Sequence, residues 1–228
     1  MQHVRRVVSI PVIAAVGLLA LAGCRSEPGV AAYVGTKKIT EERVTAIIDE
    51  AIRTRRDDAG DTVPVDRATV VSTLILNEIC THLARDPQAE GQPPITPEQI
   101  AAGYGISADT EFARHTAELQ NCLRSLKVGD PIAPTQEELA DLMKRAREAG
   151  SIPEGMSEED AARQYDNHTL RSALAQRKVL SDAVAEHDVS VSPRYRPLEF
   201  PLLWFQTRKP AVVVLIGEPD SDAIVERR

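Results

Sequence analysis

The stretch from Asp66 to about Arg85 constrains the fold more than any other, because it reads as a helix that is apolar nearly all round. Asp66 is a suitable N-cap residue. The apolar side chains that follow it cover most of the helix circumference: Val70, Val71, Leu74, Ile75, Leu76, Ile79 and Leu83. A helix of this kind is normally central and buried. We therefore expect the hydrophobic core to be built around it, with Cys80 in its second half.

Amphipathic helices with clear start signals account for most of the remaining chain. Their polar N-caps, several followed by acidic or amide side chains, are expected at Thr40, Thr96, Ser107 or Asp109, Thr135 and Ser157. The last of these helices is expected to run from Ser157 to about His187, which at roughly 30 residues exceeds a typical globular helix. The chain is therefore predicted to be mainly α.

Strand signals lie near the two ends. Val30–Val34 reads as a short strand, with Gly35-Thr36 as the turn that follows it, and Val189–Val191 is also strand-like. Residues Leu198–Gln206 and Ala211–Gly217 read as two strands of a C-terminal β-hairpin, joined by residues 207–210. Pro197, Pro201 and Pro210 restrict these strands to sheet edges or strand starts. The predicted β element is thus small.

The N-terminus has the order of a secretory signal. Arg5 and Arg6 precede an apolar run from Val7 to Leu21, and small residues follow. The run is shorter than the roughly 20 apolar residues that a membrane-spanning helix needs. Leu21-Ala22-Gly23-Cys24 resembles the bacterial lipobox, whose cysteine receives a diacylglyceryl group. This resemblance implies that residues 1–23 are removed, that Cys24 carries a lipid and that residues 24–29 are a short tether. The alternatives are a plain secreted protein and an uncleaved signal anchor.

The charge balance restricts the partners. The whole chain has a formal net charge of −7. Removing the leader takes away Arg5 and Arg6 and no acidic residue, so the mature chain stands at −9. Such a chain is a poor ligand for nucleic acid. It also gains little from anionic lipid, so we expect the acyl chains on Cys24 to hold it on the outer side of the cell membrane.

The two remaining cysteines, Cys80 and Cys122, fall in a setting that permits disulfides. A bridge between them would close a loop of about 42 residues, worth roughly 4 kcal/mol in the loop-entropy model. The alternative is two buried free thiols, since free cysteine is among the most buried residue types.

Two stretches resemble the SurA N-terminal domain family of exported peptide-binding chaperones. The first is Ala31-Ala32-Tyr33-Val34-Gly35-Thr36-Lys37-Lys38-Ile39-Thr40-Glu41, although Gly35-Thr36 stands where family members usually have Asn-Gly. The second is Val189-Ser190-Val191-Ser192-Pro193-Arg194-Tyr195, with Ser192 in place of an asparagine. The resemblance covers residues 30–195 and leaves residues 196–228, the hairpin and a polar tail, outside it. It implies a multi-helix chaperone module in which the first and last strands pair, the latter at Val189–Val191.

The resemblance implies binding of unfolded or exported polypeptides and not catalysis. Many relatives insert a prolyl isomerase domain, but the stretch between Arg85 and Ser157 already reads as three helices and leaves no room for one. No phosphate-binding loop and no nucleophile elbow occurs. The acidic run Asp57–Asp61 lacks calcium-loop spacing, and the histidines are scattered. The sequon Asn167-His168-Thr169 would fall in the middle of a helix. We expect no catalytic residue, metal, cofactor or small-molecule substrate.

The binding surface is expected to be concave and apolar. Its candidate lining residues are Tyr33, Tyr195, Phe200, Leu203, Trp204 and Phe205. The alternative is that these side chains fill the core between the hairpin and the helices. A different function is also open, in which the same body is an adaptor that docks one envelope protein, for example by adding a partner strand to an exposed hairpin edge.

Overall fold

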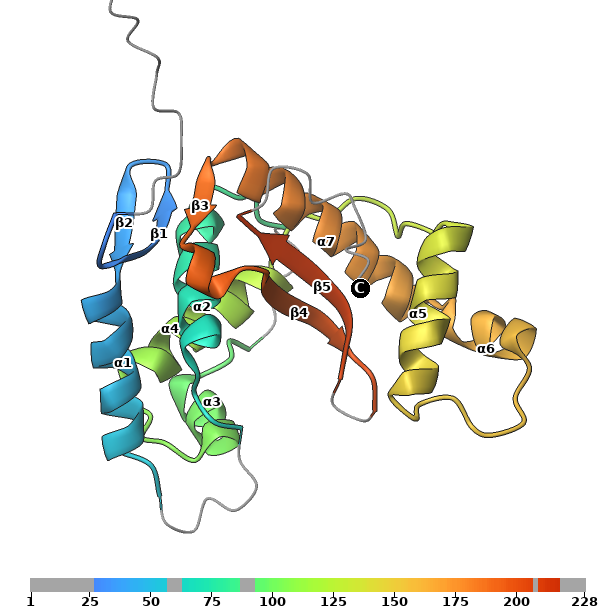
Figure 1. The fold of residues 1–228 in the computed structure, drawn as a ribbon, viewed down its shortest axis with the longest axis horizontal. Coiled ribbons are helices and arrows are strands. Elements are labelled where there is room, and N and C mark those ends of the chain that lie inside the picture. The colour runs from blue at the N-terminus through green and yellow to red at the C-terminus, as the bar shows by residue number, and fades with distance from the viewer. Residues whose placement is uncertain (1–26, 57–62, 87–92, 207–208, 218–228) are drawn as a thin grey trace, which may run out of the picture.

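The computed structural model describes residues 27–56, 63–86, 93–206 and 209–217. The described chain is mostly helical, with a small antiparallel β component (Figure 1). Its helices are α1 (Glu41–Arg53), α2 (Arg67–Cys80), α3 (Pro97–Tyr104), α4 (Glu111–Arg124), α5 (Gln136–Glu148), α6 (Glu158–Tyr165) and α7 (His168–Glu186). Its strands are β1 (Val30–Val34), β2 (Lys37–Thr40), β3 (Val189–Val191), β4 (Leu198–Trp204) and β5 (Pro210–Ile216), and a 3₁₀ turn, η2, spans Pro193–Tyr195.

A three-stranded sheet joins the two ends of the helical region. Its strand order is β2-β1-β3, and both pairings are antiparallel. Val34 lies opposite Val189 and Ala32 lies opposite Val191. The strand β2 was not predicted. Of its four residues only Ile39 is buried, whereas Lys37 and Lys38 are exposed, so it carries almost no apolar signal. Gly35, with a φ of +57°, makes the turn into β2.

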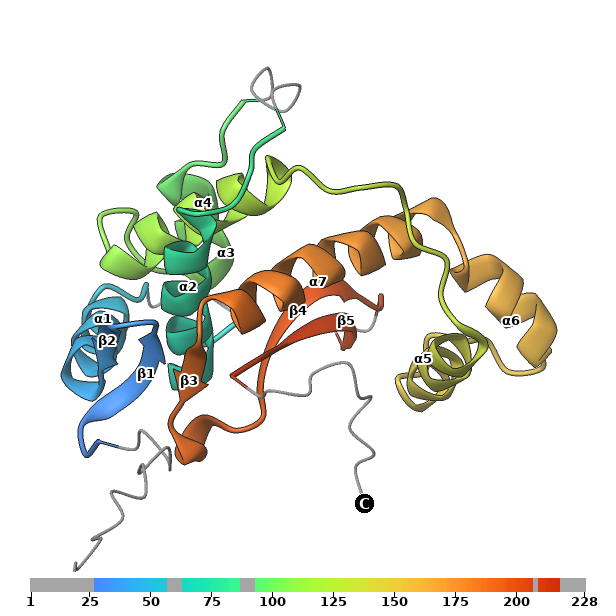
Figure 2. The ribbon, with the colours of Figure 1, turned by 90° about the horizontal axis from the view of Figure 1, so that it is seen from above.

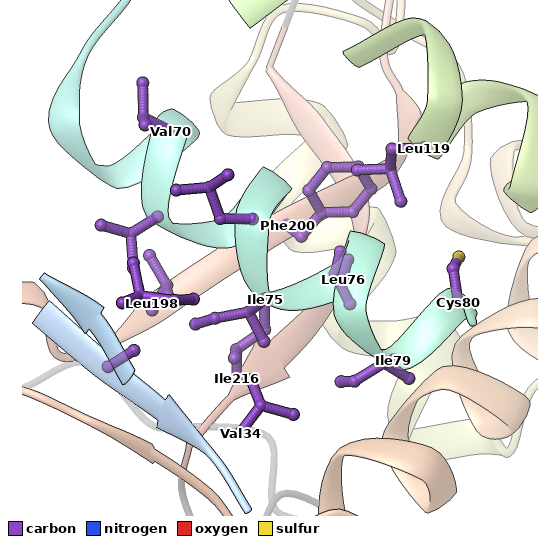
Figure 3. Close-up of a cluster of buried hydrophobic side chains, with 14 of the residues drawn as sticks. Val34, Val70, Ile75, Leu76, Ile79, Cys80, Leu119, Leu198, Phe200 and Ile216 are labelled. Atoms are coloured by element: carbon purple, nitrogen blue, oxygen red, sulfur yellow. The ribbon is translucent and has the colours of Figure 1, made fainter. Parts of the chain in front are cut away.

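The helix α2 is the centre of the core, as its sequence predicts. Every residue from Val70 to Leu76 is buried, and so are Ile79 and Cys80. Side chains from four other elements surround it in Figure 3: Val34 of β1, Leu119 of α4, Leu198 and Phe200 of β4, and Ile216 of β5. The core therefore draws on both ends of the chain. Asp66 Oδ1 caps α2 by accepting from Thr69 N at 2.7 Å.

The predicted C-terminal hairpin is confirmed as β4 and β5. The strands pair with Leu198 opposite Ile216 and Phe200 opposite Val214, and the register shifts between Pro201 and Leu203. Leu198, Phe200, Val214 and Ile216 belong to the main hydrophobic cluster around α2. Phe205, Ala211 and Val212 belong to a second cluster with α5, α6 and the first half of α7. The hairpin and α7 thus run across both clusters (Figures 1 and 2).

The expected single helix from Ser157 to His187 is wrong. It is two helices, α6 and α7, which break at Asp166 and Asn167. Asn167 is the N-cap of α7, and its Oδ1 accepts from Leu170 N at 3.1 Å. The Asp166 carboxylate receives two hydrogen bonds from Arg171, at 2.7 and 2.9 Å. The sequon asparagine therefore lies at a helix start and not within a helix.

Two helix ends also differ from expectation. The regular part of α2 stops at Cys80, about one turn before Arg85. Thr110, and not Ser107 or Asp109, caps α4 by accepting from Ala113 N at 3.3 Å. The Thr40, Thr135 and Ser157 caps occur as predicted. At Thr96 the backbone N–H donates to Gln99 Oε1 at 2.9 Å, which satisfies one free donor of α3.

Candidate functional site: the outer face of the hairpin

The six predicted lining residues do not form one surface. Tyr33, Tyr195, Phe200 and Phe205 are buried, so they do not line a groove. Phe200 packs in the main cluster, whereas Phe205 packs in the second cluster, with its ring 5.9 Å from that of Tyr165. Leu203 is half-buried against the second cluster. Only Trp204 is largely in solvent, with 53% of its surface exposed. The alternative open for these residues, burial in the core between the hairpin and the helices, holds for Tyr195, Phe200 and Phe205, whereas Tyr33 is buried in β1 outside both clusters.

The two tyrosines have structural hydrogen bonds near the three-stranded sheet. Tyr33 Oη donates to Glu27 Oε2 at 2.7 Å, and Tyr195 Oη donates to Glu41 Oε2 at 2.8 Å. Burial and the hydrogen bond to Glu41 raise the pKa of Tyr195 above its ordinary value. The phenol therefore stays protonated at neutral pH, and it ties η2 to the start of α1.

The hairpin has a second apolar face that meets neither hydrophobic cluster. Successive strand residues alternate between faces, so the neighbours of the inward Phe200, Val214 and Ile216 point outward. Within the described chain, Val213, Leu215 and Trp204 belong to neither cluster. Pro201 lies opposite Val213 and shares their side of the hairpin. We call these four apolar residues, Pro201, Trp204, Val213 and Leu215, the outer face. Glu199, which lies opposite Leu215, shares that side of the hairpin and places a carboxylate beside them.

The position of the outer face follows from what covers the opposite side. In Figure 1 the helix α7 lies behind the hairpin, and Figure 2 shows it alongside. This helix runs from β3 at one end toward α5 and α6 at the other. A two-stranded sheet normally turns only one face to a core and the other to water. Apolar residues at the outward positions Val213 and Leu215 depart from that rule. This departure is a signal in the sequence that the hairpin is apolar on both faces, although it does not tell which of the two faces is outward.

The hairpin edges are poorly suited to strand addition. Pro201, in the middle of β4, has no N–H to offer a partner strand. On the β5 side, Arg145 Nη1 of α5 donates to the backbone oxygen of Ala211 at 3.1 Å. These features are typical of edges that resist pairing with another chain. The hairpin therefore offers a partner its outer face more readily than an added strand.

An ion pair joins α5 to α7, and a second one, within α5, holds the Arg145 side chain that reaches the hairpin. Arg145 Nε contacts Asp141 Oδ2 at 2.8 Å, and Arg177 of α7 pairs with Glu138. Burial alone would raise the pKa of Glu138, but the Thr135 N–H and Arg177 outweigh it and hold that pKa below its usual value. The carboxylate therefore stays charged at neutral pH. A cavity of about 30 Å³ among these side chains has room for about one water.

The structure gives little support to a site of another kind. A hollow of about 380 Å³ between the end of α1 and α3 has a mixed lining, in which Arg56 and Glu98 lie beside small apolar residues such as Ala101. The rings of His82 and His187 contact each other with centroids 4.7 Å apart, which sequence reasoning missed. Among the described residues, no three His, Cys, Asp or Glu side chains are grouped so that they could hold a metal ion.

Two of the sequence features discussed above have no description in the structure. Cys24 and the acidic run Asp57–Asp61 lie outside the described residues. None of the helices in the described ranges is long and apolar enough to cross a membrane.

Cys80 and Cys122 form a disulfide that joins α2 to α4, with their Cα atoms 6.2 Å apart. Of the two alternatives for these cysteines, the structure has the bridge.

Comparison of the chain with protein-family models, curated proteins and solved structures finds no match.

Proposed function

We propose that this protein is a lipid-anchored envelope protein that binds unfolded or exported polypeptides through the outer face of its hairpin, without catalysing a reaction. The observation that carries the proposal is that Trp204, Val213 and Leu215 lie along one side of the hairpin and belong to neither hydrophobic cluster. Trp204 is exposed, Val213 and Leu215 are half-buried, and apolar surface gathered on one face is a feature of sites where proteins interact with other chains. The pairing of β1 with β3 around the intervening helices supports a fold of the SurA N-terminal type.

The chemistry of the outer face suits ligands of varied sequence. Its side chains are apolar and offer shape and surface rather than directed hydrogen bonds, so they discriminate weakly among apolar segments. Trp204 supplies the largest of these side chains. Withdrawing its exposed half from water on binding is worth about 2 kcal/mol, if a tryptophan buries roughly 200 Å² in all. Its indole N–H can still donate to a peptide carbonyl, as tryptophans at interfaces commonly do.

Trp204→Ala is expected to weaken binding of an unfolded client about tenfold, which corresponds to roughly 1.4 kcal/mol. The measurement is suppression of aggregation of several unrelated unfolded clients, together with a titration of one labelled client. Ile52→Ala is the matched control, because Ile52 is a large apolar residue on α1 with 63% of its surface exposed. That variant should bind as the original protein does.

The same experiment distinguishes a chaperone from an adaptor. Suppression across unrelated clients that depends on Trp204 supports the chaperone-like function. No effect on any client, combined with one dominant partner in a pull-down that Trp204→Ala abolishes, identifies the adaptor. Equal binding by Trp204→Ala and Ile52→Ala contradicts a site on the outer face.

Cys24→Ser is expected to release the protein from the membrane fraction and to abolish incorporation of labelled fatty acid. Two acyl chains give stable anchoring where one is marginal. Cell fractionation and metabolic labelling measure the two effects. A Cys24→Ser protein that stays in the membrane fraction would show that the apolar run Val7–Leu21 anchors the chain by itself.

A further inference from the structure

We propose that His82 and His187 together bind one copper(II) ion, at the place where the C-terminal ends of α2 and α7 come together. The two imidazole rings are in contact, with their centroids 4.7 Å apart and their planes inclined by 35°. The two histidines come from opposite halves of the chain, so no spacing in the sequence predicts their contact. The site uses no residue of the outer face and does not depend on the proposed function.

The separation of the two rings fits a shared metal ion. A histidine nitrogen lies about 2.0–2.1 Å from a bound metal ion, which places the ring centroid about 3.2 Å from that ion. Two such centroids are about 4.5 Å apart when the nitrogens bind at right angles and about 5.2 Å apart at the tetrahedral angle. The observed 4.7 Å lies between these values. Rotation of the rings about their side-chain bonds can therefore aim one nitrogen of each at the ion.

The backbone holds both histidines in place before an ion binds. His82 N donates to the oxygen of Ile79 at 2.9 Å, and His187 N donates to that of Ala183 at 3.0 Å. The oxygen of His187 accepts from Gly35 N at 2.8 Å, which ties this residue to the turn between β1 and β2. Ile79 and Ala183 are buried in the main hydrophobic cluster. The two ligands are thus positioned in advance, so binding an ion costs little conformational entropy.

The helix ends beside the pair favour a positive charge. The C-terminal end of a helix carries a partial negative charge, and cations are stabilised there. Neither α2 nor α7 has a basic residue in its last turn. Glu186 and Asp188, which flank His187 in the sequence, are exposed acidic residues. A metal ion held by the two imidazoles would therefore balance negative charge from both helices.

The basic side chains near the end of α2 have other partners. Lys37 forms an ion pair with Glu78, one turn before His82. Arg85 Nη1 donates to Ser125 Oγ at 2.6 Å. Within the described ranges neither imidazole of the pair takes part in a hydrogen bond or an ion pair, so the ring nitrogens remain available to a metal.

Two imidazoles completed by water suit copper(II) best. His82 is exposed and His187 is half-buried, so water reaches the pair, and the described residues group no third His, Cys, Asp or Glu with it. Imidazole binds copper, nickel and zinc, and among divalent first-row ions the affinity of a given site peaks at copper(II). The observed centroid distance is closer to the square-planar value than to the tetrahedral one, which favours copper over zinc. Calcium and magnesium prefer oxygen ligands.

Copper titration by calorimetry and electron paramagnetic resonance tests the site. Every protein is the full chain with His3→Ala and Cys24→Ser, which remove a histidine and a thiol outside the described residues. In this background, His82→Ala and His187→Ala should each lower the copper affinity at least about tenfold, because even partners that only orient a metal ligand are worth about 10–100-fold. Coupling to two imidazole nitrogens should appear in the background spectrum and be lost in each variant. His168→Ala, which replaces an exposed histidine at the start of α7, is the matched control and should bind as the background does.

The double variant His82→Ala/His187→Ala shows whether the two rings act as one site. It should lose little more affinity than either single variant, because one remaining imidazole cannot form the chelate. Losses that add up mean two separate weak sites and overturn the proposal. Equal copper affinity in the background, His82→Ala and His187→Ala overturns it as well. Unfolding of each variant without metal checks the fold, and His82 is exposed, so His82→Ala should be as stable as the background.

Discussion

Replacing Cys80 and Cys122 together by alanine is expected to lower the free energy of unfolding by about 4 kcal/mol. The bridge joins α2 to α4 across 42 positions of sequence, so it restricts the unfolded chain over a long loop. Both cysteines are buried in the main cluster, and alanine leaves no unsatisfied polar group there. The expected loss is a large part of the roughly 5–15 kcal/mol that stabilises a typical domain.

Denaturant unfolding with and without reductant measures this effect. Reductant should destabilise the original protein by a similar amount and leave the double variant unchanged. Cys24→Ala is the control, because that cysteine takes no part in the bridge. Two alkylatable thiols in the unreduced protein would contradict the prediction, and so would a melting curve that reductant does not move.

Gly217→Ala is expected to destabilise the fold by about 3 kcal/mol. The added Cβ would lie 2.4 Å from Val191 Cγ2, 3.0 Å from its Cβ and 3.2 Å from its backbone N. Overpacking of this kind costs about 1–3 kcal/mol. The left-handed backbone at φ +82° adds about 1–2 kcal/mol for any residue with a Cβ. Thermal and denaturant unfolding of the variant provide the measurement.

Two variants isolate the cause. Gly103→Ala places a Cβ in open space within α3, so it should leave stability unchanged or raise it by up to about 1 kcal/mol. Val191→Ala removes the closest clashing atom. The double variant Gly217→Ala/Val191→Ala should therefore lose less stability than the two single variants added together. If the losses of stability of the two single variants add up to that of the double variant, the contact between residue 217 and Val191 does not cause the loss in Gly217→Ala.

The elements that the sequence predicted well are those with redundant signals. For α2 the cap at Asp66 indicates where the helix begins. The apolar residues on all sides of the helix indicate a central position, because only there can all of them be buried. The break at Asn167 was missed because helical spacing of apolar residues continues on both sides of it. Its signal was a local one, an asparagine cap whose side chain competes for backbone N–H groups. The strand β2 was missed because it buries little more than Ile39.

The candidate site was predicted only in part, because aromatic side chains do not reveal which face of a strand meets the core. Tyr195, Phe200 and Phe205 are close in sequence to Trp204 and all are buried. The hairpin is apolar on both faces, and the choice between them depends on contacts with α2 and α7, far away in the chain. Strand alternation alone pairs Val213 with Leu215 on one face but gives no means of deciding that this face is the outer one.

The last strands of the chain complete the core that its first strand begins. Leu198, Val214 and Ile216 pack with Val34 and the residues of α2. During synthesis from the N-terminus, the earlier elements therefore lack part of their packing until the final hairpin has emerged. Contacts between such distant parts of a chain form late, because the intervening loop must close first. The core around α2 is thus complete only once the hairpin has been synthesised, and a chain interrupted before the hairpin lacks part of that core and is open to proteolysis.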